Sequence, residues 1–509
     1  MREEIKRITD EEVELSLLMN VPLGFAKGNL LLPLRRTNGD LVAAVAGEKG
    51  LFALLELARQ MSLNPKPLWG DAAVITEAVN RYYGQLGSAE EVMGDIREED
   101  LSSVATEFER PKDILELTEE APIIRLLNAL LRQALKERAS DIHIEPFEKE
   151  LEVRLRVDGV LRKILSPPKI IQDALISRVK IMANLDIAER RLPQDGRIRL
   201  LIGGKDIDVR VSLIPTIHGE RVVLRILDRR GGVIGLESLG MDSQMRTGFE
   251  ELLSRHNGII LVTGPTGSGK TTTLYAALNR IHTSEKNIIT IEDPVEYELK
   301  GIGQIQINPR AGLTFASGLR SILRQDPDVI MVGEIRDLET AQIATQASLT
   351  GHLVLSTLHT NDAASAIARL LDIGVEPFLV ASSLVGVLAQ RLVRLNCPSC
   401  SEPFQLGASE SAFISGHSGK ANVVKGKGCP KCGGTGYIGR AGIFELLAID
   451  SGTRRLITER ADAKSILEAA VSRGMTTLRE DGLRKVLHGE TTPEEVLRVT
   501  QKENAGVQI

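Results

Sequence analysis

Aromatic residues are scarce in this chain: they make up 3% of its 509 residues, and tryptophan occurs only once. Few aromatic side chains leave little for stacking against bases, which disfavours a binder of single-stranded nucleic acid. A strong excess of one charge is also missing, since the formal net charge is −5. No global basic field therefore draws the chain to a phosphate backbone. We expect no nucleic-acid partner.

Long apolar runs are absent as well. No stretch of about 18 apolar residues occurs, so we expect no segment to span a bilayer. The first ten residues carry charge but lack the apolar stretch of a signal peptide. Hydrophobic residues make up 42% of the chain, which is enough for sizeable cores, and the length favours about three domains. These features predict a cytoplasmic, multi-domain protein.

Cysteine is limited to four residues, arranged as two Cys-x-x-Cys pairs. Cys397 and Cys400 form the first pair, and Cys429 and Cys432 form the second. This spacing lets both sulfurs of a pair face one tetrahedral Zn²⁺. A redox-active pair is the alternative, but two pairs, the second followed by two glycines, favour structural zinc in a reducing compartment. We predict one zinc site, outside the hydrolytic chemistry.

A glycine-rich run from Gly264 to Thr271 reads G-P-T-G-S-G-K-T and matches the phosphate-loop pattern G-x-x-x-x-G-K-S/T. The apolar, β-branched stretch 258–263 before it is typical of a buried parallel strand, and 271–281 after it has helical apolar spacing. Strand, loop and helix thus occur in the order that directs a helix N-terminus at an anion. A glycine-rich turn with an accidental lysine does not explain that order. The run predicts an ATP or GTP site.

Each residue type in this loop suits phosphate binding. The glycines let backbone N–H groups turn inward and surround phosphate oxygens. Lys270 is expected to reach the β- and γ-phosphates, and the Thr271 hydroxyl to bind Mg²⁺. The predicted nucleotide-binding residues are Gly264, Pro265, Thr266, Gly267, Ser268, Gly269, Lys270, Thr271 and Thr272.

Two further apolar stretches are predicted to be strands that end in acids. Residues 288–294 end with Glu292 and Asp293 before a proline, and residues 328–334 end with Glu334. An acid at the carboxyl end of a strand beside a phosphate loop can orient and deprotonate the attacking water. A capping carboxylate is the alternative, and it fits one such strand better than two. We predict that these three acids are catalytic, with Glu334 as the base.

A third apolar strand lies between His352 and His359. A lone histidine is more often structural, but we expect both of these to lie where they could sense the γ-phosphate. The usual Walker B strand ends in an aspartate that binds Mg²⁺, whereas Gly333 occupies that place here.

Before the phosphate loop, the chain alternates in composition. Residues 29–34 and 41–46 flank Asn38-Gly39, a strong hairpin signal, and helical apolar spacing follows them. The predicted parts are an N-terminal α/β module (1–84), an acidic linker (85–120), a middle mixed α/β domain (121–230), a glycine-rich hinge (231–241), and a nucleotide-binding domain (242–509) with a tetracysteine module (397–432) and C-terminal helices (453–498). For the first module we weigh a docking role against a plain structural extension.

Arg210 and Arg225 stand on adjacent predicted strands of the middle domain. Because side chains alternate along a strand, each arginine should point away from its apolar neighbours. From the pattern alone, a solvated sheet face is the preferred interpretation.

Several motifs together resemble the secretion ATPase superfamily: the phosphate loop, the acidic box I-E-D-P-V-E, the Gly-Glu block and the histidine box. More narrowly, A-S-D-I-H-I-E-P at 139–146, R-L-P-Q-D-G-R at 191–197 and H-G-E-R-V-V-L-R at 218–225 are similar to the middle domain of the type II secretion ATPase family. The resemblance covers about residues 120–500 closely. In that family the missing Walker B aspartate is normal.

The resemblance implies an α/β fold with a RecA-like P-loop ATPase domain that carries a zinc-binding insertion, a PAS-like middle domain and an N-terminal docking domain. It also implies a homo-hexamer on the cytoplasmic face of an inner membrane that drives pseudopilus assembly. Its partners would be the cytoplasmic domain of a bitopic inner-membrane component and a polytopic platform protein. Arg210 and Arg225 match arginines that approach the nucleotide. A type IV pilus extension ATPase, a RecA-like nucleic-acid motor and a nucleotide-switched scaffold are the alternatives.

Overall fold

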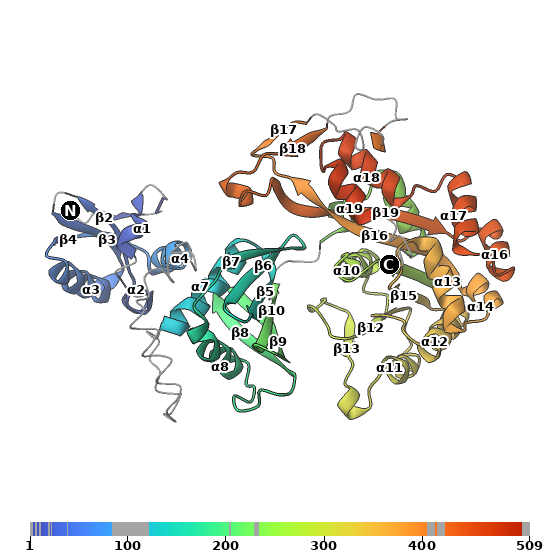
Figure 1. The fold of residues 1–509 in the computed structure, drawn as a ribbon, viewed down its shortest axis with the longest axis horizontal. Coiled ribbons are helices and arrows are strands. Elements are labelled where there is room, and N and C mark those ends of the chain that lie inside the picture. The colour runs from blue at the N-terminus through green and yellow to red at the C-terminus, as the bar shows by residue number, and fades with distance from the viewer. Residues whose placement is uncertain are drawn as a thin grey trace. The chain divides into compact units, whose positions relative to one another are not determined.

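The computed structural model describes residues 4–83, 122–228, 234–404, 413–414 and 423–500, apart from residues 6, 7, 10, 11, 19, 20, 22, 38, 203 and 204. Two compact units divide the chain, Met1–Arg230 and Gly231–Ile509 (Figure 1). The predicted linker, 85–120, and Asn38 of the predicted hairpin turn lie outside the described residues. No helix of the described residues is both long and apolar enough to cross a membrane.

The N-terminal part of the first unit is a four-stranded sheet in the order β1-β4-β3-β2. The helical spacing found in the sequence forms α3, which buries Leu54, Leu57 and Ala58. β4 was not predicted, because it contains two prolines and lacks alternation. The elements are β1 (Glu4–Ile5), α1 (Leu15–Leu18), α2 (Leu23–Asn29), β2 (Leu31–Thr37), β3 (Asp40–Val45), α3 (Gly47–Gln60), β4 (Asn64–Gly70) and α4 (Ala72–Tyr83).

A six-stranded antiparallel sheet in the order β7-β6-β5-β10-β9-β8 forms the second part of this unit. The alternating strand predicted over 151–157 is β6, with Val153 and Leu155 buried in one core with the helix residues Leu127 and Leu175. The elements are α7 (Pro122–Lys136), β5 (Ala139–Pro146), β6 (Leu151–Val157), β7 (Val160–Leu165), η3 (Lys169–Ile171), α8 (Gln172–Met182), β8 (Gln194–Ile202), β9 (Lys205–Thr216) and β10 (Gly219–Asp228).

The second unit is built on a seven-stranded sheet in the order β13-β12-β14-β15-β11-β16-β19. Its strand pairs are parallel except for the β16–β19 pair. Buried clusters cover both faces, one with α9 and α10 and the other with α11, α12 and α13. Because β11, β12, β14 and β15 run in the same direction, the segments that follow them gather at one edge of the sheet.

The elements of this unit up to its last parallel strand are η4 (Leu236–Ser238), α9 (Ser243–Leu253), β11 (Gly258–Thr263), α10 (Lys270–Ile281), β12 (Ile288–Glu292), β13 (Gly303–Gln306), η5 (Pro309–Ala311), α11 (Phe315–Ile322), β14 (Val329–Val332), α12 (Leu338–Leu349), β15 (Leu353–Leu358), α13 (Ala363–Ile373), α14 (Pro377–Ser383) and β16 (Leu384–Asn396). The remaining elements are β17 (Ser401–Pro403), β18 (Val424–Gly426), η6 (Pro430–Cys432), β19 (Tyr437–Ala448), α16 (Ser451–Thr458), α17 (Ala463–Ser472), α18 (Leu478–Leu487) and α19 (Pro493–Thr500).

The predicted hinge, 231–241, lies within the described residues from residue 234 onward. Leu236, Leu239 and Met241 are buried in the second unit. The backbone carbonyl of Leu239 accepts a hydrogen bond from Gly442 of β19 at 3.0 Å. The hinge prediction was therefore wrong for residues 236–241, because glycine content alone does not reveal the three apolar side chains that anchor them.

Candidate active site

The phosphate loop connects β11 to α10, as the sequence predicts. Gly264, Gly267 and Gly269 all have positive φ angles, and Gly269 takes the left-handed conformation directly before α10. No side chain caps the N-terminus of α10, whereas aspartates cap α9, α12 and α13. The first amides of α10 thus keep the donors that an anion requires, so the loop fits a nucleotide phosphate.

Lys270 is buried within the loop. Its amino group donates to the carbonyl oxygens of Gly264 at 2.8 Å and Pro265 at 3.1 Å. Burial lowers the pKa of this amine to about 8, although the nearby Glu334 carboxylate opposes that shift. Two backbone carbonyls thus hold the lysine head inside the loop, where an incoming phosphate would offer a stronger, charged acceptor.

Glu334 follows β14 at the same edge of the sheet, and its side chain is 13% exposed. One carboxylate oxygen lies 2.5 Å from Nη2 of Arg336, and the other lies 3.5 Å from Nε2 of His359. Burial lowers the pKa of His359, and the charge of Lys270 adds to that effect. The structure therefore brings the predicted base, the loop lysine and one predicted histidine together, with Arg336 as an additional member.

Glu292 is buried at the end of β12. Its carboxylate accepts hydrogen bonds from Thr290 Oγ1 at 2.6 Å, from Gln304 Nε2 at 3.1 Å and from the Tyr275 hydroxyl. Burial raises the pKa of Tyr275, and the Glu292 carboxylate raises it further, so the phenol stays a donor. With both oxygens engaged, Glu292 suits an anchor between α10 and β13 better than a base. Asp293, the next residue, is exposed.

His352 lies at the opposite end of the parallel strands from the phosphate loop. β15 runs parallel to β11, with Leu353 opposite Gly258 and Leu358 opposite Thr263. His352 precedes β15, and its Nδ1 lies 2.8 Å from the carbonyl oxygen of Ala347. The expectation that both histidines of the box lie at the γ-phosphate is therefore wrong for His352 within one chain, because the strand between them separates them by its full length.

Two polar residues of β16 were missed by the sequence analysis. Gln390 hydrogen-bonds the phosphate loop, and Nη2 of Arg391 donates to Asn361 Oδ1 at 2.7 Å, just beyond His359. Neither residue belongs to the motifs described above. The only signal was an amide and a guanidinium within the otherwise non-polar run from Leu384 to Val393.

Arg210 and Arg225 lie directly opposite each other on β9 and β10. Their neighbours Val209, Val211 and Leu224 are buried, whereas the Arg225 side chain is 58% exposed, as alternation predicts. Nε of Arg225 lies 2.9 Å from Oδ1 of Asp141. The paired arginines thus form part of the polar face of this sheet.

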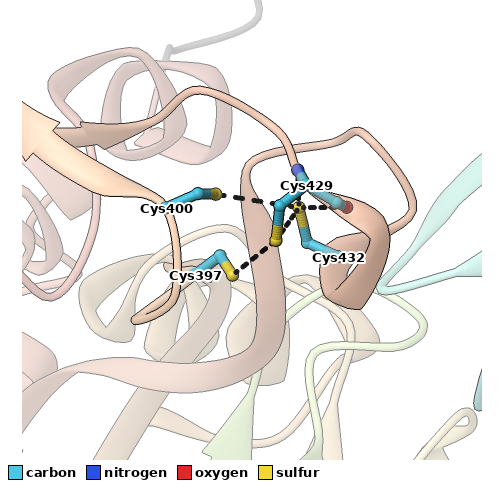
Figure 2. Close-up of side chains that lie close together, drawn as sticks. All are labelled: Cys397, Cys400, Cys429 and Cys432. Atoms are coloured by element: carbon cyan, nitrogen blue, oxygen red, sulfur yellow. Dashed lines mark hydrogen bonds between the residues drawn. The ribbon is translucent and has the colours of Figure 1, made fainter.

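The four cysteine sulfurs all lie within 4.8 Å of one another (Figure 2). Cys397 and Cys429 are 3.8 Å apart at Sγ, and Cys400 and Cys432 are 3.9 Å apart. Tetrahedral coordination with Zn–S bonds of about 2.3 Å requires sulfur–sulfur separations of about 3.8 Å. The backbone N–H groups of Cys429 and Gly436 also donate to the Cys432 sulfur. The cluster fits Zn²⁺.

Comparison with known proteins agrees with this geometry. Residues 116–498 match the family described as Type II/IV secretion system protein, and residues 4–89 match the MshEN domain. The chain belongs to the type II/IV secretion system protein family.

Two relatives are similar to the chain in sequence, and one solved structure is similar in fold. The chain is 54% identical over 424 residues to the type II secretion system ATPase E of Vibrio cholerae, covering 83% of this chain and 84% of that protein. It is 44% identical over 497 residues to the type IV pilus assembly ATPase PilB of Myxococcus xanthus, covering 96% and 88%. The Legionella pneumophila ATPase DotB shares its fold, with a TM-score of 0.55, 22% identity and coverage of 76% of this chain and 97% of that chain.

The second unit is thus a RecA-like domain of a secretion-family protein, and the chain is an ATPase.

Proposed function

We propose that this chain is the motor of a type II secretion system, which uses ATP hydrolysis to drive pseudopilus assembly and the export of periplasmic proteins across the outer membrane. The observation that carries the proposal is the cluster of Lys270, Glu334 and His359 at the phosphate loop, in a chain 54% identical to a type II secretion ATPase. The related pilus extension ATPase is the second candidate, since PilB of M. xanthus covers 96% of this chain. Its lower identity, 44%, favours secretion.

In the proposed reaction, the amides of the loop and Lys270 hold the β- and γ-phosphates, and the Thr271 hydroxyl would hold Mg²⁺, which neutralises phosphate charge when bound. Water attacks the γ-phosphorus as its bond to the bridging oxygen breaks, and Glu334 accepts the water proton. Arg336 and His359 each contact one oxygen of Glu334, and these two contacts orient the carboxylate.

The middle domain contributes positive charge in this proposal. Arg210 and Arg225 would close on the γ-phosphate, where a placed cation can be worth about 10³–10⁵ in rate. Their adjacent positions on the polar face of one sheet support a paired role. In this proposal the chain bends near the boundary between the two units, after residue 230, so that the sheet would swing onto ATP and away from ADP.

We further infer a homo-hexamer on the cytoplasmic face of the inner membrane, held there through proteins. The match of residues 4–89 to the MshEN domain supports an N-terminal docking domain. Its partner would be the cytoplasmic domain of a bitopic inner-membrane component, and the motor would act on a polytopic platform protein. The four cysteines would hold one structural zinc, away from the hydrolytic site.

Hydrolysis can be tested by separating binding from turnover. Glu334→Gln keeps the shape of the side chain but removes the base, so ATP should bind while turnover falls by about 10²–10⁴. Lys270→Ala should weaken both binding and turnover.

Glu339→Gln is the matched control, because Glu339 also pairs with an arginine, Arg320 at 2.5 Å, but lies exposed on α12. Its turnover should stay within about twofold of wild type, as expected for a surface ion pair. Near wild-type turnover in Glu334→Gln would overturn the assignment of the base.

A further inference from the structure

β16 extends past the point where β11 turns into the phosphate loop. The last pair of the parallel ladder between them joins Thr263 to Ala389. Gln390 is the next residue of β16, so it lies beside the loop rather than beside the strand. On its other side Gln390 is paired with Phe444 of β19. Its backbone thus belongs to a strand held between two neighbours, which is a rigid base for a side chain.

The side-chain amide of Gln390 joins the phosphate loop to the first turn of α10. Gln390 is 2% exposed. Its Nε2 donates to the carbonyl oxygen of Ser268 at 2.6 Å, within the loop. Its Oε1 accepts from Thr273 Oγ1 at 2.7 Å, in the first turn of α10. Both polar ends of the amide are satisfied, and each is satisfied by a different segment that must be placed correctly for phosphate binding.

The loop also packs closely against this residue. A Cβ added to Gly264 would lie 2.4 Å from the Gln390 carbonyl oxygen, and one added to Gly269 would lie 2.8 Å from its Nε2. Both separations are too short for any side chain to fit without movement. Two of the glycines that define the motif are therefore required partly by the approach of Gln390.

We propose that Gln390 is a positioning residue of the nucleotide site. Its amide holds the Ser268–Gly269 turn and the first turn of α10 in the phosphate-binding arrangement before nucleotide arrives. It acts through the loop and contacts no phosphate itself. The inference deepens the proposed motor function, but it concerns nucleotide binding, so it can fail or succeed apart from hydrolysis.

The test uses the full-length chain, with Mg-ADP and a non-hydrolysable ATP analogue as probes in calorimetric titrations. Gln390→Met keeps the length of the side chain but removes both hydrogen bonds. We expect the Kd of both probes to rise about tenfold, because one buried interaction in a preorganised site is lost. KM for ATP should rise similarly, while kcat falls less than about threefold, since the transition state and the ground state use the same loop.

Asn396→Leu is the matched control. Asn396 lies on the same strand, and its buried amide likewise makes two hydrogen bonds, both as a donor, to the backbone carbonyls of Val424 and Gly489 at 3.0 Å. Its loss should lower the melting temperature as Gln390→Met does, yet leave the Kd of ADP within about twofold. An equal loss of ADP affinity in Asn396→Leu would show general destabilisation and overturn the proposal.

Thr273→Val removes one of the two hydrogen bonds without touching Gln390. We expect Thr273→Val to raise Kd less than Gln390→Met does. The double variant should bind no more weakly than Gln390→Met alone, because both changes break the same hydrogen-bonded unit. If Gln390→Met does not fold, the Kd measured for Thr273→Val alone tests the proposal. ADP binding at wild-type affinity in whichever variant folds would overturn the proposal, even if the wild-type chain hydrolysed no ATP.

Discussion

A buried carboxylate on β19 should make the stability of the second unit depend on pH. Glu445 is 3% exposed. It accepts hydrogen bonds from the backbone N–H of Ala363 at 2.9 Å and of Leu478 at 3.3 Å, which are the first residues of α13 and α18. Burial raises the pKa of Glu445 to about 7, the two amides oppose that shift, and the charge of Asp362 adds to it. One buried side chain therefore accepts the first amide of each of two helices, and its burial carries an energetic cost.

The direction of the pH dependence follows from comparing the protonation of Glu445 in the folded and unfolded chains. Between the ordinary pKa of 4.5 and the folded value of about 7, the folded chain keeps a proton that the unfolded chain has released. The free energy of unfolding therefore falls as the pH rises through this window. At about 1.4 kcal/mol per pH unit, the free energy of unfolding falls by roughly 3 kcal/mol across the full window.

Glu445→Gln tests this reasoning by urea unfolding between pH 5 and pH 8. Glutamine cannot ionise, so the fall in stability with rising pH should be smaller by up to about 3 kcal/mol than in wild type. Below pH 5 the variant should be less stable by about 1 kcal/mol, since its amide offers only one acceptor for two N–H groups.

Glu468→Gln is the control, because this glutamate of α17 is 68% exposed and its ion pair contributes little. It should leave the pH dependence unchanged. If Glu445→Gln showed the same pH dependence as wild type, Glu445 would not carry the raised pKa and the argument from its burial would be refuted.

Three further predictions concern the zinc site, the arginines of the middle domain and the N-terminal domain. Purified protein should hold about one zinc per chain, and Cys429→Ser should lower zinc content and thermal stability more than basal hydrolysis; elemental analysis without zinc would contradict this. Arg210→Ala and Arg225→Ala should each cut turnover tenfold or more while nucleotide affinity changes little. Wild-type turnover in both variants would refute the role proposed for these arginines. Deleting residues 1–90 should keep ATP binding but release the protein from membrane fractions, so a truncated chain that still sediments with membranes would count against the docking role.

Local sequence patterns predicted the segments around the phosphate loop closely. The strand predicted over 258–263 is β11 with the same bounds, and the strand predicted over 151–157 is β6. Both are runs whose burial follows from their own residues, because an apolar β-branched stretch or a strict alternation fixes which faces are covered.

β4 shows where such patterns fail. Pro65 and Pro67 lack N–H groups on the same side of the strand, since they are two residues apart. On that side, among the described residues, β1 pairs with Trp69 and Gly70, beyond both prolines, so the missing donors cost little. Pairing with β3, not the residues of β4 themselves, makes this segment a strand.

The sequence by itself determined which chemical groups are present: a loop whose glycines and Lys270 suit phosphate binding, an acid after a buried strand, and two cysteine pairs with metal-binding spacing. The tertiary structure decided which of these groups meet. His359 lies with Glu334 while His352 lies at the far end of β15, and Gln390 reaches Ser268 across 122 residues of sequence. The physical reason is that a motif describes neighbours along the chain, whereas the distance between two side chains depends on strand direction and sheet order, which exist only once the sheet has formed.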